Sequence, residues 1–144
     1  MASPDSNIRV AILGASGIGE VHARIMHSLG AQIVAILGST KSSADLTADK
    51  LNKKYGFKPA SYSNFEALLK NEKPEAISIC TPSEHHFAQL KVALERNLPV
   101  FCEKPLFWKK NITSNEFEFQ LDKLKSYSEP KLLVNTSNTT FLDN

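Results

Sequence analysis

The sequence predicts an α/β fold, namely a doubly wound, mainly parallel sheet with helices on both faces. Apolar runs of strand length recur along the chain without the polar alternation of a half-exposed sheet, so they indicate strands buried on both faces. Segments with helical spacing separate these runs, which is the order that a parallel sheet needs. We therefore expect right-handed crossovers between the strands.

The first elements follow directly from this pattern. The apolar run IRVAILG at 8–14 predicts a strand. The segment at 20–30 predicts a helix, because apolar residues recur at helical spacing through Val21, Ile25 and Leu29.

The same pattern continues through the next elements. The run AQIVAILG at 31–38 predicts a second strand, and a helix is expected at 42–56. Ser43 is the candidate N-cap of that helix, because its side-chain oxygen can accept a hydrogen bond from the first turn. A short helix is expected at 64–71, with Asn64 as its cap.

The second half of the chain repeats the alternation. Apolar runs predict strands at 75–80, 99–103 and 131–136. An amphipathic helix is expected at 84–97 and a further helix at 113–128. This order contains no internal repeat and no linker.

Length and charge bound the class of protein. The 144 residues suffice for one domain, which we expect at 8–136 after a loose tail at 1–7. Residues 137–144 are expected to form a tail or the start of a missing C-terminal domain. The net charge of +2 is too small to indicate a nucleic-acid partner, and the apolar runs are too short to span a membrane.

The cysteines and histidines carry little chemistry of their own. Cys80 and Cys102 each end an apolar run, which favours buried free thiols in a reducing compartment. The polar N-terminus lacks the apolar stretch of a signal peptide, so a cytoplasmic location is the default expectation. His85 and His86 are adjacent and point in different directions, so no metal site is expected.

The turn GASGIG between the first strand and the first helix is the most informative motif. A dinucleotide fingerprint has three glycines here, and Gly14 and Gly19 take the first and third places. Ser16 takes the second place, and Gly17 after it restores the lost backbone freedom; Ile18 completes the turn. Free N–H groups at a helix N-terminus attract an anion, so we favour a bound diphosphate over a plain tight connection.

The end of the second strand distinguishes NADP from NAD. An NAD site has an acidic residue there, which binds the ribose 2′-hydroxyl. This chain has Ser39, Thr40 and Lys41 instead, and the nearest carboxylate, Asp45, lies inside the next helix. Two hydroxyls and an ammonium suit a 2′-phosphate, so NADP is the expected cofactor and NAD the alternative. The competing interpretation makes Lys41 an ordinary surface lysine.

Three stretches together resemble the Gfo/Idh/MocA family of NAD(P)-dependent oxidoreductases. These stretches are LGASGIGEVHA, NFEALLKNEKPEAISICTPSEHH and ALERNLPVFCEKPL. Their order and spacing match the family over residues 8–106. The resemblance implies an N-terminal Rossmann-type domain, followed in the family by a C-terminal α/β domain.

The resemblance also implies roles for the loops after the later strands. Their motif residues are Thr81, Pro82, His86, Glu103, Lys104 and Pro105. By resemblance these loops border the cofactor, and Lys104 lies near the nicotinamide, where its charge polarises the substrate or orients a proton donor. Pro105 would fix a rigid turn, with a cis bond left open. The implied reaction is hydride transfer between nicotinamide and a sugar-like or cyclic polyol substrate.

The sequence departs from the family in three ways. Ser83 replaces an asparagine, and threonines replace arginines after the last strand, where Asn138 and Phe141 still match. The catalytic Asp and His of the family belong to a C-terminal domain that this sequence does not include. The chain is therefore expected to be either a fragment of an enzyme or a short homologue without its own proton donor. The alternative function is that of a non-catalytic dinucleotide sensor. A third interpretation is a nucleotide-sugar or another non-dinucleotide ligand in the same crevice. The sequence leaves open whether the chain is a monomer or a homo-oligomer.

Overall fold

The computed structural model describes residues 7–127 and 131–135. Within the chain it distinguishes two compact units, Met1–Thr81 and Pro82–Asn144.

Two expectations fall largely outside the described residues. The first is the tail at 1–7, of which Asn7 alone is described. The second is the segment at 137–144, which includes Asn138 and Phe141.

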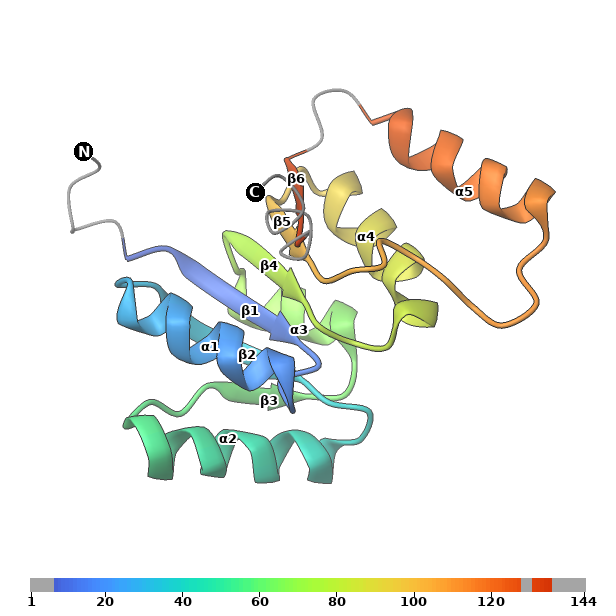
Figure 1. Ribbon diagram of the computed structural model, residues 1–144. Coiled ribbons are helices and arrows are strands. Elements are labelled where there is room, and N and C mark those ends of the chain that lie inside the picture. Colours follow the sequence, from blue (N-terminus) through green and yellow to red (C-terminus); the bar gives the residue numbers. More distant parts are fainter. Residues whose placement is uncertain (1–6, 128–130, 136–144) are drawn as a thin grey trace, which may run out of the picture. The chain divides into compact units, whose positions relative to one another are not determined.

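The first unit alternates strands and helices as the sequence predicts (Figure 1). Its elements are β1 (Arg9–Leu13), α1 (Ile18–Ser28), β2 (Gln32–Leu37), α2 (Lys41–Tyr55), β3 (Ala60–Tyr62), α3 (Phe65–Glu72) and β4 (Ala76–Ile79). The strands are parallel and lie in the order β3-β2-β1-β4. The loops that follow β1, β2 and β4 therefore leave the sheet at the same edge.

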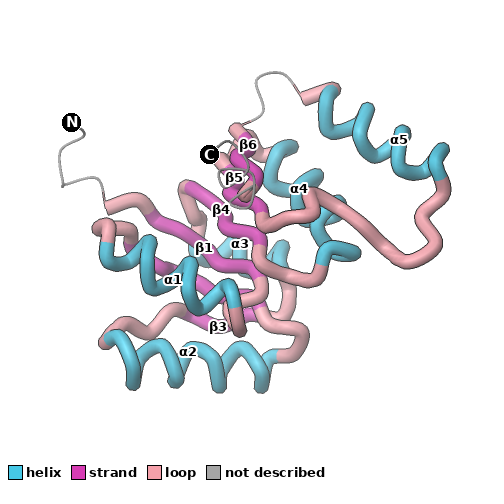
Figure 2. Tube along the Cα trace, in the orientation of Figure 1, coloured by secondary structure: helices cyan, strands magenta, loops and turns pink. Residues whose placement is uncertain are grey.

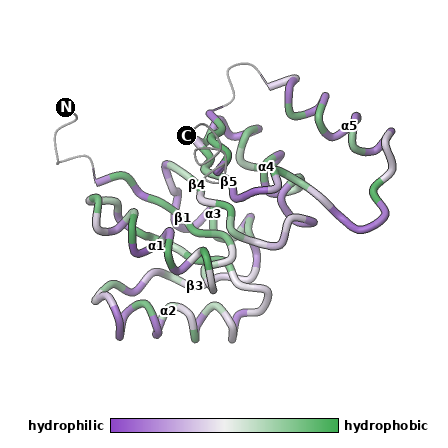
Figure 3. Tube along the Cα trace, in the orientation of Figure 1, coloured by the Kyte–Doolittle hydropathy of each residue, from purple (hydrophilic) through white to green (hydrophobic). Residues whose placement is uncertain are grey.

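Helices cover both faces of this sheet. Helices α1 and α2 lie on one face, and α3 lies on the other (Figures 1 and 2). The consecutive residues Ala11, Ile12 and Leu13 are all fully buried, which requires cover on both faces of β1. Figure 3 shows β1 as mostly hydrophobic and α2 as largely hydrophilic. The doubly wound α/β class predicted from the sequence is confirmed.

Helix α1 packs on the sheet through its smallest residues. Gly19 and Ala23 are buried there together with His22. The apolar residues at helical spacing face away from the sheet instead, with Ile25 42% and Leu29 80% exposed. The close approach at Gly19 leaves no room for larger side chains beneath the helix.

Two local features differ from the sequence prediction. The N-cap of α2 is Thr40, whose hydroxyl accepts a hydrogen bond from the Ser43 amide, so the assignment of Ser43 as N-cap is wrong. Ser43 takes the third helical position, and its hydroxyl accepts from the Thr40 amide, which completes a capping box. Strand β3 lies where no strand is predicted, because three residues at a sheet edge are too few to show an apolar pattern.

The second unit also alternates helices and strands. Its elements are the 3₁₀ helix η1 (Ser83–His85), α4 (His86–Glu95), β5 (Val100–Cys102), α5 (Ser114–Lys125) and β6 (Leu132–Val134). Strands β5 and β6 pair in parallel. The helix expected at 84–97 thus begins as a 3₁₀ turn, in which the His85 amide donates to the Pro82 carbonyl.

Candidate functional site

Each glycine of the turn after β1 occupies a position that excludes a side chain or favours glycine. Gly14 has a φ of 79°, and a Cβ there would lie 2.8 Å from the Thr81 amide nitrogen. A Cβ on Gly19 would lie 2.0 Å from the Gly14 carbonyl oxygen. Gly17 precedes α1 in open space, with a φ of 62°. Close approach of the backbone therefore requires glycine at positions 14 and 19, and the positive φ favours glycine at position 17.

The start of α1 presents backbone amides to solvent. Ser16 and Gly17 are exposed, and no described residue accepts a hydrogen bond from their N–H groups. Their carbonyl oxygens accept from the amides of Gly19, at 3.3 Å, and Glu20, at 3.2 Å. Ile18 beside them is 45% exposed. Unpaired amides at a helix N-terminus suit a phosphate, so these residues fit the diphosphate of a dinucleotide.

A buried polar cluster joins α1 to β4 next to this turn. His22 Nδ1 lies 2.9 Å from Ser78 Oγ and 3.2 Å from Cys80 Sγ. The Cys80 side chain also borders the Gly19 backbone, with its Cβ 3.3 Å from where a Gly19 Cβ would lie. These contacts hold the first turns of α1 against the end of β4.

The residues expected to select the cofactor lie at the neighbouring strand end. Ser39 and Thr40 are exposed in the loop after β2, and Lys41 is the first residue of α2. The Gly14 amide donates to the Leu37 carbonyl at 2.9 Å, so this loop and the glycine turn leave the sheet side by side. The structure thus brings the predicted diphosphate and 2′-phosphate residues to one edge of the first unit.

The ammonium group of Lys41 is already engaged. Its Nζ donates to the Asp45 carboxylate, one turn later on α2, and to Ser61 Oγ on β3 at 2.8 Å. The Ser61 hydroxyl donates to the same carboxylate oxygen. The hydrogen bond from Lys41, and then that from Ser61, holds the pKa of Asp45 below its ordinary value of 3.8. A carboxylate therefore stands beside the predicted phosphate-binding lysine, although none follows the strand itself.

In the second unit, His86 faces the loop after β5. The residue is buried, and its Nδ1 lies 3.0 Å from the Pro105 carbonyl oxygen and 3.2 Å from that of Leu106. Carbonyl oxygens only accept, so Nδ1 carries the hydrogen and donates it. His86 therefore holds the loop that carries Lys104.

The same loop carries the Glu103-Lys104-Pro105 triplet. The Lys104–Pro105 peptide bond is cis, the form that the sequence leaves open. Lys104 and Pro105 are exposed, whereas half-buried Glu103 accepts a hydrogen bond from Asn135 Nδ2, after β6, at 2.7 Å. The loop is thus fixed from β6 as well as from α4, with the lysine at its surface.

A third contact ties the far end of this loop to η1. Ser83 Oγ donates to the Trp108 carbonyl at 3.0 Å, and the Trp108 amide donates to the Ser83 carbonyl at 3.3 Å. The serine that replaces the family's asparagine therefore has a contact of its own. Thr81, half-buried, and Pro82, exposed, precede this segment.

Sequence reasoning missed several of these partners. The spacing of four residues between Lys41 and Asp45 on one helix was a visible signal of an ion pair. Ser61 and Asn135 approach from elements distant in sequence, and no local pattern marks them. Ser78 lies in an otherwise apolar strand, and its polar side chain is explained by its contact with the buried His22, which the sequence pattern does not show.

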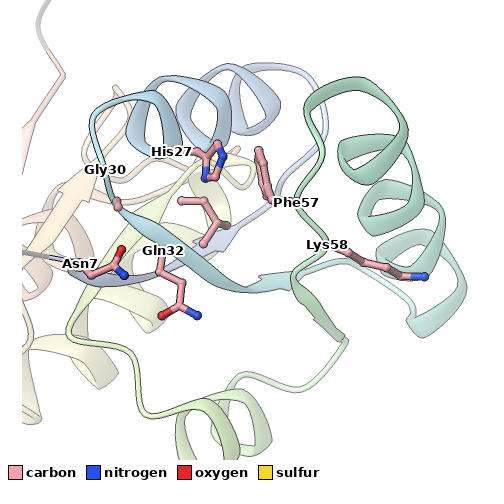
Figure 4. Close-up of a pocket in the computed structure, with 8 residues that line it drawn as sticks. Asn7, His27, Gly30, Gln32, Phe57 and Lys58 are labelled. Carbon is pink, nitrogen blue, oxygen red and sulfur yellow. The ribbon is translucent and has the colours of Figure 1, made fainter.

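A separate hollow of about 370 Å³ lies at the other end of β2 (Figure 4). Its walls include Gln32, at the start of that strand, and the rings of His27 and Phe57, whose centroids are 4.3 Å apart. Lys58 also lines it, and its ammonium pairs with Asp49 at 2.6 Å. The hollow is therefore distinct from the strand ends where the predicted residues gather.

No helix among the described residues has the length and apolar character needed to cross a membrane. These residues also contain no group of three or more side chains of the metal-binding types that could hold an ion.

The chain is similar in sequence to a known protein family and to several of its members. Residues 8–126 match the model of an oxidoreductase family with an NAD-binding Rossmann fold. D-glucoside 3-dehydrogenase of Escherichia coli K12 is 34% identical over 72% of this chain, and D-xylose 1-dehydrogenase (NADP(+)) 2 of Haloferax volcanii is 32% identical over 75%. The chain spans only 29% and 32% of these relatives.

A solved structure shows the same fold. The crystal structure of myo-inositol 2-dehydrogenase from Lactobacillus plantarum matches 94% of this chain with a TM-score of 0.75 and 25% identity. The match covers 38% of that protein. The arrangement of strands and helices described above is therefore that of a Rossmann-type domain.

Proposed function

The chain belongs to the Gfo/Idh/MocA family of oxidoreductases, and on this premise we propose that it is the NADP-binding domain of an enzyme acting on a sugar-like or cyclic polyol substrate. The observation that carries the proposal is the glycine turn, where the Ser16 and Gly17 amides face solvent without an acceptor among the described residues. The nicotinamide cofactor supplies the hydride chemistry when bound, and this chain's residues bind and orient it.

The adenosine half of the cofactor would lie against the first unit. The turn residues proposed to hold the diphosphate are Gly14, Ser16, Gly17, Ile18 and Gly19. Ser39, Thr40 and Lys41 are proposed to hold the 2′-phosphate, because hydroxyls and an ammonium donate to it. One relative carries NADP(+) in its name, which supports NADP as a cofactor used within the family.

The resemblance supports a second group of residues at the nicotinamide end. These are Thr81, Pro82, His86, Glu103, Lys104 and Pro105. Lys104 is the proposed catalytic residue, since its exposed ammonium can polarise a substrate oxygen or orient a proton donor. The contacts of His86 with the loop support a fixed position for this lysine.

The relatives favour the enzyme over the non-catalytic sensor. Their printed names are those of dehydrogenases that act on a glucoside, a xylose and inositols. We extend the substrate class to this chain as a carbohydrate-like small molecule. A cytoplasmic location remains part of the proposal, supported by the buried thiols of Cys80 and Cys102.

Calorimetric titration with NADPH and NADH tests cofactor binding. The wild-type chain is expected to bind both, with NADPH tighter. Ser16→Asp places a negative charge beside the diphosphate and should weaken NADPH binding at least about tenfold, through like-charge repulsion.

Ser28→Asp is the matched control, because it adds the same charge at an exposed position at the other end of α1. Its affinity for NADPH should equal that of the wild type. Equal weakening in both variants, or no binding of either dinucleotide to the wild type, would contradict the proposal.

A further inference from the structure

The contacts of Lys41 bear on how strongly this site prefers one cofactor. Its ammonium donates to Asp45 and to Ser61, and the Ser61 hydroxyl also donates to Asp45. The carboxylate is therefore held from its own helix, α2, and from the edge strand β3. It stands at the same strand ends where a 2′-phosphate would bind.

We propose that Asp45 is a specificity-determining residue, which lowers the affinity of this site for a 2′-phosphate by keeping the Lys41 ammonium in an ion pair. This inference rests on the proposed function and names a control on its cofactor preference. A dinucleotide without the 2′-phosphate has a neutral 2′-hydroxyl at this position, which neither needs the ammonium nor is repelled by the carboxylate.

The exposure of the pair sets the size of the effect. The side chains of Lys41 and Asp45 are 60% and 51% exposed, so their ion pair is weak and a phosphate dianion can displace it. The carboxylate then remains near the bound phosphate and repels it, since its place on α2 and the hydrogen bond from Ser61 hold it there. Removal of the Asp45 charge ends both its competition for the Lys41 ammonium and its repulsion of the 2′-phosphate. We expect this to raise the affinity for NADPH roughly tenfold.

The test compares two variants that raise the net charge by the same amount. Asp45→Asn removes the carboxylate beside Lys41. Asp49→Asn, one turn further along α2, removes the carboxylate that pairs with Lys58. Calorimetry with NADPH and NADH should show NADPH binding tightened roughly tenfold in Asp45→Asn, with NADH changed less than about twofold and the control unchanged for both.

A double variant assigns the gain to the lysine. Relative to Lys41→Ala alone, the Asp45→Asn, Lys41→Ala protein should gain less NADPH affinity than Asp45→Asn gains over the wild type. Both changes lie on the exposed surface of α2, and thermal melting of each variant checks that it is folded.

The outcomes separate this inference from the proposed function. If the wild type binds dinucleotides and Asp45→Asn leaves the ratio of the NADPH and NADH affinities unchanged, the role of Asp45 is refuted and the proposed function stands. An equal gain in the Asp49→Asn control also refutes it, because net charge alone then explains the effect. If the wild type binds neither dinucleotide, both proposals fall.

Discussion

At the scale of single residues, His86 shows how a motif residue can act through its neighbours. The family resemblance places it beside the cofactor, and its ring nitrogen Nδ1 donates to the carbonyls of Pro105 and Leu106. Lys104 lies in the same loop, one peptide bond before Pro105. We therefore regard His86 as a positioning residue for the nicotinamide end of the proposed site.

Replacement of His86 should affect one half of the cofactor only. His86→Leu removes the donor and leaves two carbonyls without it, so the loop around Lys104 should loosen. We expect NADPH to bind roughly tenfold more weakly, while adenosine 2′,5′-bisphosphate, which lacks the nicotinamide, binds as in the wild type. Calorimetry with the two ligands measures this difference.

His86→Asn provides the matched control for that experiment. The amide of asparagine can place an N–H donor near the position of Nδ1, so NADPH affinity should recover at least in part. If His86→Leu weakened the binding of both NADPH and adenosine 2′,5′-bisphosphate, the residue would instead have a general structural role. That result would refute the assignment of His86 to the loop.

The cofactor residues show how far a sequence can predict a site. The glycines could be assigned because each position has a backbone reason that the strand–turn–helix pattern reveals. The preference for NADP was inferred from Ser39, Thr40 and Lys41, and it remains a prediction. The Asp45 carboxylate is close in sequence, but its alignment with Lys41 also depends on Ser61, which β3 brings from a distance.

At the scale of elements, Glu20 links α1 to α2. Its carboxylate accepts hydrogen bonds from Lys50, from Lys54 at 2.9 Å and from the Tyr55 hydroxyl at 3.1 Å. The side chain is only 12% exposed. The hydrogen bond from Lys50, followed by that from Lys54, lowers the pKa of Glu20 from 4.5 to about 2. The helix that begins the proposed diphosphate site is thus fixed to its neighbour by charge.

This link predicts a pH-dependent stability. The pKa of Glu20 is lower in the folded chain than in the unfolded chain, so its stabilising contribution is complete above pH 4.5 and is lost as the pH falls toward 2. Glu20→Gln should lower the Tm at pH 7. The gap in Tm between this variant and the wild type should close between pH 4.5 and pH 2.

Glu118→Gln, which removes an exposed carboxylate from α5, is the control for thermal melting. It should leave the Tm at pH 7 nearly unchanged. A Glu20→Gln protein that melts like the wild type at pH 7 would show that the α1–α2 link adds no stability.

Elements were predictable where a local signal sets them. The strands follow from apolar runs, and Asn64 caps α3 through the Ala67 amide, as its side chain suggested. Strand β3 exists because it pairs with β2, which no local pattern announces. The exposure of Ile25 and Leu29 likewise depends on the close packing at Gly19, which the spacing of apolar residues does not reveal.

At the scale of the whole molecule, the fold was the most predictable level. Few topologies are possible for parallel strands separated by helices. A solved dehydrogenase that matches 94% of the chain has the fold that the sequence predicts. The substrate is less determined, because the chain covers about a third of its relatives and the proposed chemistry involves more than the cofactor.

The most direct test follows the backbone amide resonances of the chain by nuclear magnetic resonance during titration with NADPH. The amides of Ser16 and Gly17 should shift on binding, because they would donate to the diphosphate. Inorganic diphosphate should shift the same two resonances at higher concentration. The account would be contradicted if NADPH bound while both amides stayed unchanged, or if saturating NADPH shifted no resonance at all.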